Sequence, residues 1–400
     1  MFKQMLRNYD KSLIISVLSL CMIGLVMVYS SSYYTAMVRY GESSSYFFTR
    51  QLLFFGVSLV VFLLALLAPY KVYKKLMKIM LLFSLFLLTA VLLFGRTANN
   101  AQSWISFGSV GFQPAEFVKL GLIIYLAAIY SKKQSYLSDF VRGVLPTLVV
   151  IVTIFCLVAI QPDLGTAMLI VGTSGVMIIC SGIRLKHLIL LFLLAMASCT
   201  ILGIFLSEEQ LSRFTAAYDP FSDPQGSGYH LINSYIAIAH GGIIGQGLGG
   251  STQKLGFLPE AHTDFISAII AEEFGFFGIG IVISLLAYIV FRGFFIAIRC
   301  KDTFGSLLVI GICGMIGIQS IVNLGAATGL LPITGVPLPF ISYGGSSLLL
   351  LMMAMGIVIN ISSFVNMERK KPDMIQKNSS DRSLKLVKNQ NKRRAVSRLP

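Results

Sequence analysis

Long apolar runs without a single charged residue recur along almost the whole chain, and they decide what it can fold into. Each is about as long as a membrane-spanning helix needs, roughly 17–25 residues. Only 12% of the 400 residues are charged, whereas a soluble domain averages about 25%. Seven separate runs cover residues 12–38, 51–70, 79–95, 143–162, 164–183, 188–207 and 274–291. They predict an all-α polytopic membrane protein, because barrel strands would be short and alternating.

Three further spans bring the expected number of transmembrane helices to ten. Residues 303–367 contain no charge, and Pro332, Pro337 and Pro339 divide them into two spans. A tenth span covers about 114–130. Irregular backbone at membrane depth persists only when it is buried in protein or faces water. The proline-rich residues 331–347 are therefore expected to form a broken, re-entrant segment that lines an outer cavity.

The basic residues indicate the orientation. With an even number of spans, both termini lie on the same side of the membrane. If that side is the cytoplasm, the inner segments hold 26 Lys and Arg residues and the outer segments five. The positive-inside rule then places both termini in the cytoplasm. The net charge of +15 thus reflects topology and a basic tail rather than nucleic-acid binding. The tail, residues 368–400, is expected to be disordered and attracted to anionic membrane lipids, or to dock a cytoplasmic partner.

Two outer segments are polar enough to carry function. They are residues 96–113 and a large extracellular loop, 207–264, between the seventh and eighth spans. The loop holds six acidic residues against Arg213 and Lys254, so an anion there needs specific groups or a bridging cation. Within it, residues 227–238 have the pattern of an interfacial amphipathic helix, and the glycines of 241–250 allow close backbone approach.

Asp264 is the leading catalytic candidate. It ends a cluster of ionisable residues at the mouth of the apolar run 274–291, where an ionised carboxylate is costly without a partner or a purpose. Such a group suits chemistry on a molecule that is half lipid and half water-soluble. The alternative is that Asp264 caps the next helix, since Asp is a favoured N-cap.

Other candidates each have a plainer interpretation. Glu116 and Lys119 are spaced i, i+3 and face one side of a helix, as a structural ion pair or as part of a site. Trp104, the only tryptophan, is a membrane anchor or a sugar or lipid contact. Arg213 and Lys254 are phosphate-binding cations or solvated loop charges.

Five motifs together resemble one family. They are Phe-Gln-Pro-Ala-Glu at 112–116 followed by Lys119, Gln-Pro-Asp-Leu-Gly-Thr at 161–166, Asp-Pro-Gln-Gly-Ser-Gly-Tyr at 223–229, Leu-Pro-Glu-Ala-His-Thr-Asp-Phe at 258–265 and Leu-Pro-Phe-Ile-Ser-Tyr-Gly-Gly-Ser-Ser at 338–347. Up to about residue 367 the chain resembles the SEDS proteins (shape, elongation, division and sporulation). The motifs at 226–229 and 259–262 favour the division branch over the elongation branch, with the sporulation branch as an alternative. The sequence departs from the family at 102–104, where many members carry a basic residue just before the tryptophan.

The resemblance implies a SEDS glycosyltransferase domain over residues 1–367. Its implied reaction is polymerisation of lipid II on the outer face of the cytoplasmic membrane, during septal peptidoglycan synthesis. A glycan linked to undecaprenyl pyrophosphate passes to the GlcNAc 4-hydroxyl of an acceptor with inversion. Asp264 would take the proton of the attacking hydroxyl, and the leaving pyrophosphate needs positive charge rather than an acid. The expected substrate-binding residues are Trp104, Glu116, Lys119, Arg213, Lys254, Glu260 and His262.

The resemblance also implies partners. No penicillin-type transpeptidase domain is expected outside the membrane spans, so cross-linking is expected to need a class B penicillin-binding protein, alongside other divisome membrane proteins. No zinc site is expected, because the spacing of the histidines and acids fits no standard pattern. Mg²⁺ or Mn²⁺ is a candidate for bridging carboxylate and pyrophosphate, and no organic cofactor is expected. The competing functions are a lipid II flippase and a non-catalytic divisome scaffold. The outward position of the ionisable cluster and the lack of a clear internal repeat favour the enzyme.

Overall fold

The computed structural model describes residues 7–98, 101–107, 110–137, 139–204 and 208–369. The expected basic tail lies outside the described residues beyond Arg369. Within them, eight helices are long and apolar enough to cross a membrane: α2 (Lys11–Arg39), α3 (Tyr46–Leu67), α4 (Lys71–Phe94), α5 (Pro114–Lys132), Phe140–Ala159, which comprises a π-helical turn and α6 (Leu145–Ala159), α11 (Ile266–Arg299), α12 (Thr303–Ala327) and the C-terminal helix Gly345–Arg369. Two further apolar helices, α7 (Leu164–Cys180) and α8 (Leu185–Ile204), lie between α6 and the outer loop in the chain. The prediction of an all-α polytopic membrane protein is confirmed.

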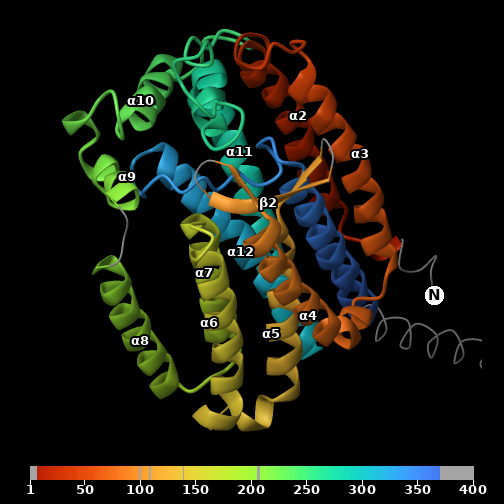
Figure 1. The fold of residues 1–400 in the computed structure, drawn as a ribbon. Helices are drawn as coiled ribbons and strands as arrows, with labels where there is room; N and C mark the ends of the chain where they lie inside the picture. Colours follow the sequence, from red (N-terminus) through yellow and green to blue (C-terminus); the bar gives the residue numbers. More distant parts are fainter. Residues whose placement is uncertain (1–6, 99–100, 108–109, 138, 205–207, 370–400) are drawn as a thin grey trace, which may run out of the picture.

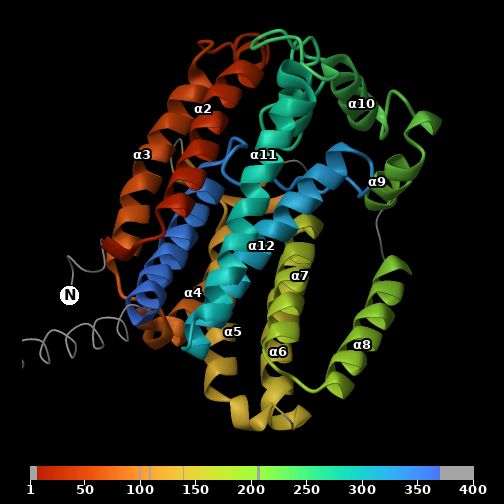
Figure 2. The same cartoon turned by 180° about the vertical axis from the view of Figure 1, so that it is seen from behind.

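The helices differ in how much of their surface is buried. Most of the residues of α5, α12 and the C-terminal helix are buried within the bundle, whereas α3, α4 and α11 leave many large apolar side chains exposed. Lipid can cover those side chains, because it is as apolar as they are. In Figure 1 and, from behind, in Figure 2, α2 and α3 run side by side at one edge, and α8 stands at the opposite edge. Helices α11 and α12 pack against each other in the middle.

A small sheet interrupts the helical fold in the first outer segment. Strands β1 (Arg96–Ala98), β2 (Ala101–Phe107) and β3 (Val110–Phe112) form an antiparallel meander in that order. Phe112, the last residue of β3, pairs with Ile105 of β2. Helix α5 begins two residues later, at Pro114. No strands were predicted here, because strands of three to seven residues are too short to form long apolar runs.

The second outer segment contains α9 (Glu208–Tyr218), a 3-10 turn (Pro220–Ser222) and α10 (Tyr229–Gly241). The helix expected over 227–238 is therefore present, and it begins two residues later. A loop rich in turns then runs from 242 to 265. This whole segment lies between the seventh and eighth apolar helices of the chain, as the sequence predicts.

The glycine-rich loop fits into a kink of α11. Gly275 has φ 65° and ψ −161° inside that helix, a conformation essentially restricted to glycine. The kink frees backbone groups that a straight helix would pair. Gln246 N donates to Glu272 O at 2.9 Å, Gly247 N donates to Glu273 O at 2.9 Å, and Phe276 N donates to Gly242 O at 3.0 Å. The loop thus satisfies the groups that the kink leaves open.

Residues 328–344 connect α12 to the C-terminal helix without regular secondary structure, so the expected broken segment is present. Two amides one turn apart on α12 hold it in place. Gln319 Nε2 donates to Pro337 O at 2.9 Å, and Asn323 Nδ2 donates to Val336 O at 2.8 Å. Asn323 Nδ2 also donates to the main-chain oxygen of Asp264 at 2.7 Å. Helix α12 therefore positions the broken segment and the end of the outer loop together.

Candidate active site

One cavity of about 2390 Å³ joins the membrane helices to the outer loops. Its larger part is apolar and is lined by α6, α7 and α8, with Phe155, Val171 and Leu191 as examples. Its other part is polar and is lined by the outer loops and the broken segment. Among the side chains there are those of Arg39, Trp104, Glu116, Asp163, Arg213, His230, Glu260 and Asp264. The cavity thus combines a long apolar wall with a charged end.

Asp264 lies at the polar end, two residues before α11 begins. The N-cap residue of α11 is Phe265, and no side-chain hydrogen bond caps this helix. Asp264 is therefore not the N-cap of α11, which was the alternative role expected from the sequence. Gly335 of the broken segment has φ 71°, and a Cβ built on it would lie 3.6 Å from Asp264 Oδ2. The carboxylate therefore lies beside the backbone of the broken segment at Gly335.

The surroundings of Asp264 suit a general base. Burial, and to a lesser degree the charge of Glu260, raise its pKa from 3.8 to about 7, while Arg213 opposes this shift and Asp163 adds to it. A base works best when its pKa lies near the operating pH, since it is then both ionised and strong enough to take the proton. Perturbed pKa values in a cleft are typical of functional sites.

Two further carboxylates share the polar end. Glu260 has φ 55° and accepts a hydrogen bond from Thr263 Oγ1 at 2.7 Å. Asp163 is the N-cap of α7, where it accepts from Thr166 N at 3.0 Å and from Thr166 Oγ1 at 2.9 Å. Gln113 Nε2 also donates to Asp163, at 3.3 Å. The sequence analysis did not single out Asp163, although it lies in one of the five motifs.

Glu116 and Lys119 form a buried ion pair. Lys119 Nζ lies 2.8 Å from Glu116 Oε1, and the two side chains are 3% and 5% exposed, respectively. Glu116 lines the large cavity, while Lys119 reaches Gln319 Oε1 at 3.4 Å. Since Gln319 also holds Pro337, the pair connects with the broken segment.

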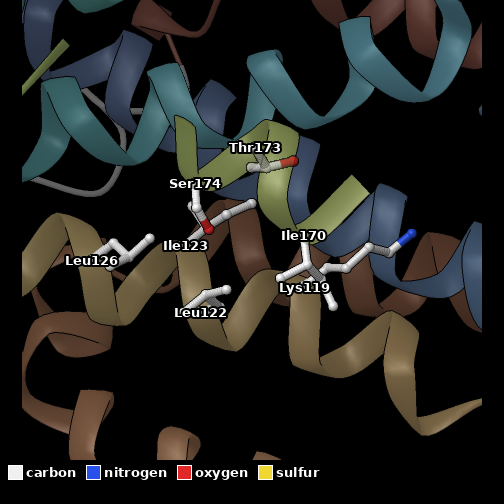
Figure 3. A pocket seen from close by; sticks show the side chains of 7 residues that line it. All are labelled: Lys119, Leu122, Ile123, Leu126, Ile170, Thr173 and Ser174. Carbon is white, nitrogen blue, oxygen red and sulfur yellow. The ribbon is translucent and has the colours of Figure 1, made fainter. Parts of the chain in front are cut away.

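A second, much smaller cavity of about 10 Å³ lies between α5 and α7 beside Lys119. Figure 3 shows Lys119, Leu122 and Leu126 on one wall and Thr173 and Ser174 on the other. The hydroxyls of Thr173 and Ser174 are buried and have no hydrogen-bond partner among the described residues. The space is about enough for a single water molecule.

Two arginines bring positive charge to the large cavity. Arg213 comes from α9, as expected, and Arg39 comes from the last residue of α2. Arg39 is one of the five basic residues expected in the outer segments, and no site role was predicted for it. The fold brings Arg39 to the same cavity as Arg213, although the two residues are more than 170 positions apart in the chain.

Lys254 does not belong to this set. Its side chain is fully buried, and Nζ lies 2.5 Å from Glu273 Oε1 and 3.0 Å from Ser30 Oγ. It is not among the described residues that line the cavity. The structure therefore places Lys254 in an ion pair that ties the outer loop to α11 and α2, away from any phosphate in the cavity.

Of the two remaining predicted residues, Trp104 lines the cavity and His262 does not. Trp104 on β2 lines the cavity, and it packs so closely over Gly111 that a Cβ there would lie 3.1 Å from its ring. His262 is buried behind the cavity wall, where it packs on Phe47 with ring centroids 4.5 Å apart and on Tyr343. Burial lowers its pKa. His262 thus supports Tyr343, which does line the cavity.

No three His, Cys, Asp or Glu side chains among the described residues are grouped closely enough to hold a metal ion. Asp163, Glu260 and Asp264 share the cavity wall but form no closed set of ligands. A hard divalent cation is often bound by one or two carboxylates together with the phosphates of a substrate. The polar end fits that arrangement rather than an all-protein metal site.

Residues 11–367 match the family model of FtsW, RodA and SpoVE, described as cell cycle proteins. The chain belongs to this family. The expected membership of the SEDS proteins is thereby confirmed. A relative in the family, the probable peptidoglycan glycosyltransferase FtsW of Bacillus subtilis (strain 168), is 50% identical over 386 residues, which cover 93% of this chain and 96% of the relative. Stage V sporulation protein E of the same organism is 40% identical over 358 residues, or 89% of this chain and 97% of the relative.

Solved structures of the family share the fold. A chain from the structure "Structural coordination of polymerization and crosslinking by a peptidoglycan synthase complex" superposes with a TM-score of 0.74 at 29% identity, covering 89% of this chain and 98% of that chain. The rod shape determining protein RodA of Thermus thermophilus superposes with a TM-score of 0.66 at 27% identity, covering 88% and 96%. The higher identity to FtsW agrees with the division branch favoured by the motifs.

Proposed function

We propose that this protein is a peptidoglycan glycosyltransferase that polymerises lipid II on the outer face of the cytoplasmic membrane, at the division septum. The observation that carries the proposal is Asp264, a carboxylate with a pKa raised to about 7 at the polar end of a cavity whose other wall is apolar. Relatives named peptidoglycan glycosyltransferase FtsW support it.

The two parts of the cavity match the two parts of such a substrate. A polyprenyl chain can lie along α6, α7 and α8, whose apolar side chains give it surroundings as apolar as the lipid it leaves. Its pyrophosphate and sugars then lie at the polar end, beside Arg39 and Arg213. Both arginines can form charge-assisted hydrogen bonds with phosphate oxygens.

The reaction follows from these positions. Asp264 takes the proton from the 4-hydroxyl of the acceptor as that oxygen attacks the anomeric carbon of the donor. The bond from that carbon to the pyrophosphate breaks, with inversion. The leaving group departs as an anion and needs no proton, so one carboxylate and nearby cations suffice. Preorganised positive charge from Arg39 and Arg213 stabilises the developing negative charge.

Cross-linking of the product falls to a partner, which we take to be a class B penicillin-binding protein transpeptidase. Support comes from the solved relative, whose structure is described as a complex that coordinates polymerization and crosslinking. Mg²⁺ or Mn²⁺, if bound between pyrophosphate and the carboxylates, would neutralise charge on the leaving group. Polymerisation at an unchanged rate in excess EDTA would remove the metal from the proposal.

Purified protein supplied with lipid II tests the proposal, alone and with the transpeptidase partner. The wild type should form long glycan strands. Asp264→Asn keeps the shape of the side chain but cannot accept the proton, so the rate should fall by at least about 10²-fold. A thermal melting curve checks that the variant is folded. Strands of normal length at a normal rate from Asp264→Asn would overturn the assignment of the base.

A further inference from the structure

His230 is a cavity residue with no role in the mechanism above. It lies in the first turn of α10 and lines the cavity together with Asp264. Its ring stacks on Phe265, the residue next to Asp264, with centroids 5.8 Å apart and planes 20° apart. Phe265 follows directly on Asp264 in the chain, so this stacking joins α10 to the segment that carries the reacting carboxylate.

The ring has one buried nitrogen and no protein partner for it. Nδ1 of His230 is buried and makes no hydrogen bond to any described residue. Stacking on Phe265 restrains rotation of the ring, so Nδ1 stays sealed from the cavity that His230 lines. A ligand in the cavity can therefore meet only the other ring nitrogen, Nε2.

The charge state of the ring narrows the kind of ligand. Burial lowers the pKa of His230, with Glu260 opposing the shift and Arg213 adding to it. The ring is therefore neutral at neutral pH, with one N–H donor and one acceptor nitrogen. Phosphate would favour the arginines, which keep their charge and have more donors. A neutral imidazole suits an uncharged polar group, such as a hydroxyl or an acetamido group.

We infer that His230 binds an uncharged polar group of the sugar that lies beside Asp264, through Nε2. The inference rests on the proposed function, since it assigns a further contact within the same substrate. His230 is then a substrate-binding and positioning residue rather than the base. It orients the saccharide, while Asp264 takes the proton.

Four substitutions distinguish a hydrogen-bonding role of His230 from a role in packing alone. His230→Gln can place an amide nitrogen near the position of Nε2, and His230→Asn near that of Nδ1. His230→Phe keeps a ring on Phe265 without any nitrogen, and His230→Ala removes both ring and nitrogen. His240 lies on the same helix, is exposed and is not among the described cavity-lining residues, so His240→Phe is the matched control.

Binding is measured with fluorescent lipid II in the Asp264→Asn background, so that turnover is slow, and with undecaprenyl pyrophosphate as a probe that lacks sugar. We expect His230→Phe, His230→Asn and His230→Ala to bind lipid II about tenfold more weakly, the loss of one well-made hydrogen bond. His230→Gln should stay within about threefold. Binding of undecaprenyl pyrophosphate should not change, and His240→Phe should bind both probes normally.

Two outcomes overturn the inference. Unchanged lipid II binding by a folded His230→Phe variant means that the ring only packs. Equal weakening for both probes means that His230 contacts phosphate rather than sugar. Neither outcome touches the proposed function, which fails separately if the wild type does not polymerise lipid II.

Discussion

At the scale of single residues, the charges around Asp264 set its working pH. Glu260 and Asp163 favour its protonated form and Arg213 favours its ionised form. The base is active only when ionised, so the rate should fall as the pH drops through about 7. Glu260→Gln should move this acid limb to lower pH, and Arg213→Gln should move it to higher pH. Initial polymerisation rates from about pH 5.5 to 9 at saturating lipid II measure both shifts, since the normal range of tuned catalytic pKa values lies there. Shifts in the same direction would contradict the role of these charges.

The same pKa has a consequence for stability. Its value in the folded protein lies above the ordinary 3.8, so the fold binds this proton more tightly than the unfolded chain does. The stability contributed by protonated Asp264 is present below about pH 4 and is lost as the pH rises through about 7. Asp264→Asn stays neutral, and its melting temperature at pH 8 should be equal to or above that of the wild type. The difference should shrink toward pH 4. A variant that melts below the wild type at pH 8 would contradict the cost of burying this charge.

At the scale of elements, the kink of α11 depends on one glycine. A Cβ at Gly275 would lie 2.5 Å from Gly245 N and from Ile243 O, both of them backbone atoms that cannot easily move. Gly275→Ala should therefore destabilise the protein by about 1–3 kcal/mol or more, through strain in a glycine-only conformation and displacement of the outer loop. Gly280 is the matched control on the same helix, since nothing lies within 4 Å of its Cβ position. Gly280→Ala should be neutral or up to about 1 kcal/mol stabilising. Thermal unfolding in detergent compares the two, and equal melting temperatures would contradict the role of the kink.

The buried pair of Lys254 and Glu273 is the second device that holds the outer loop on α11. Removing only one partner leaves an uncompensated buried charge, at a cost of about 3–5 kcal/mol. Lys254→Met should therefore lower the melting temperature strongly, and adding Glu273→Met should restore most of it. Lys301 is exposed, so Lys301→Met is the control and should change little. A double variant no more stable than Lys254→Met would show that the pair is not coupled.

The same elements show what the sequence could and could not predict. The apolar runs gave the helices, because length and composition are enough to identify them. Asp264, Glu260, Arg213, Trp104 and Glu116 all line the cavity, since their motifs lie at the ends of spans or in the outer segments. The packing of elements against one another could not be predicted from the sequence. It pairs Lys254 with a glutamate 19 residues further on, and it brings Arg39, Asp163 and His230 to the same wall.

At the scale of the whole molecule, function depends on which end of the bundle faces outward. Helices α9 and α10 and the turn-rich loop lie together at one end of the bundle (Figure 1), and residues of all three line the polar end of the cavity. The basic segments between other helices, such as the start of α4 at Lys71, belong to the opposite end under the positive-inside rule. An enzyme that uses lipid II exported from the cytoplasm needs the polar end outside.

Cysteine labelling tests this orientation directly. In a variant whose six cysteines are replaced, Gln225→Cys adds one exposed thiol to the outer loop, and Lys75→Cys adds one to the basic end. A membrane-impermeant maleimide should label Gln225→Cys in intact protoplasts and Lys75→Cys only after permeabilisation. The cysteine-free variant controls for background, and its polymerisation activity checks the fold. The reverse pattern would place Asp264 at the cytoplasmic surface, where no exported substrate could reach it. The proposed reaction would then have no access to its lipid II, whatever the chemistry of the cavity allows.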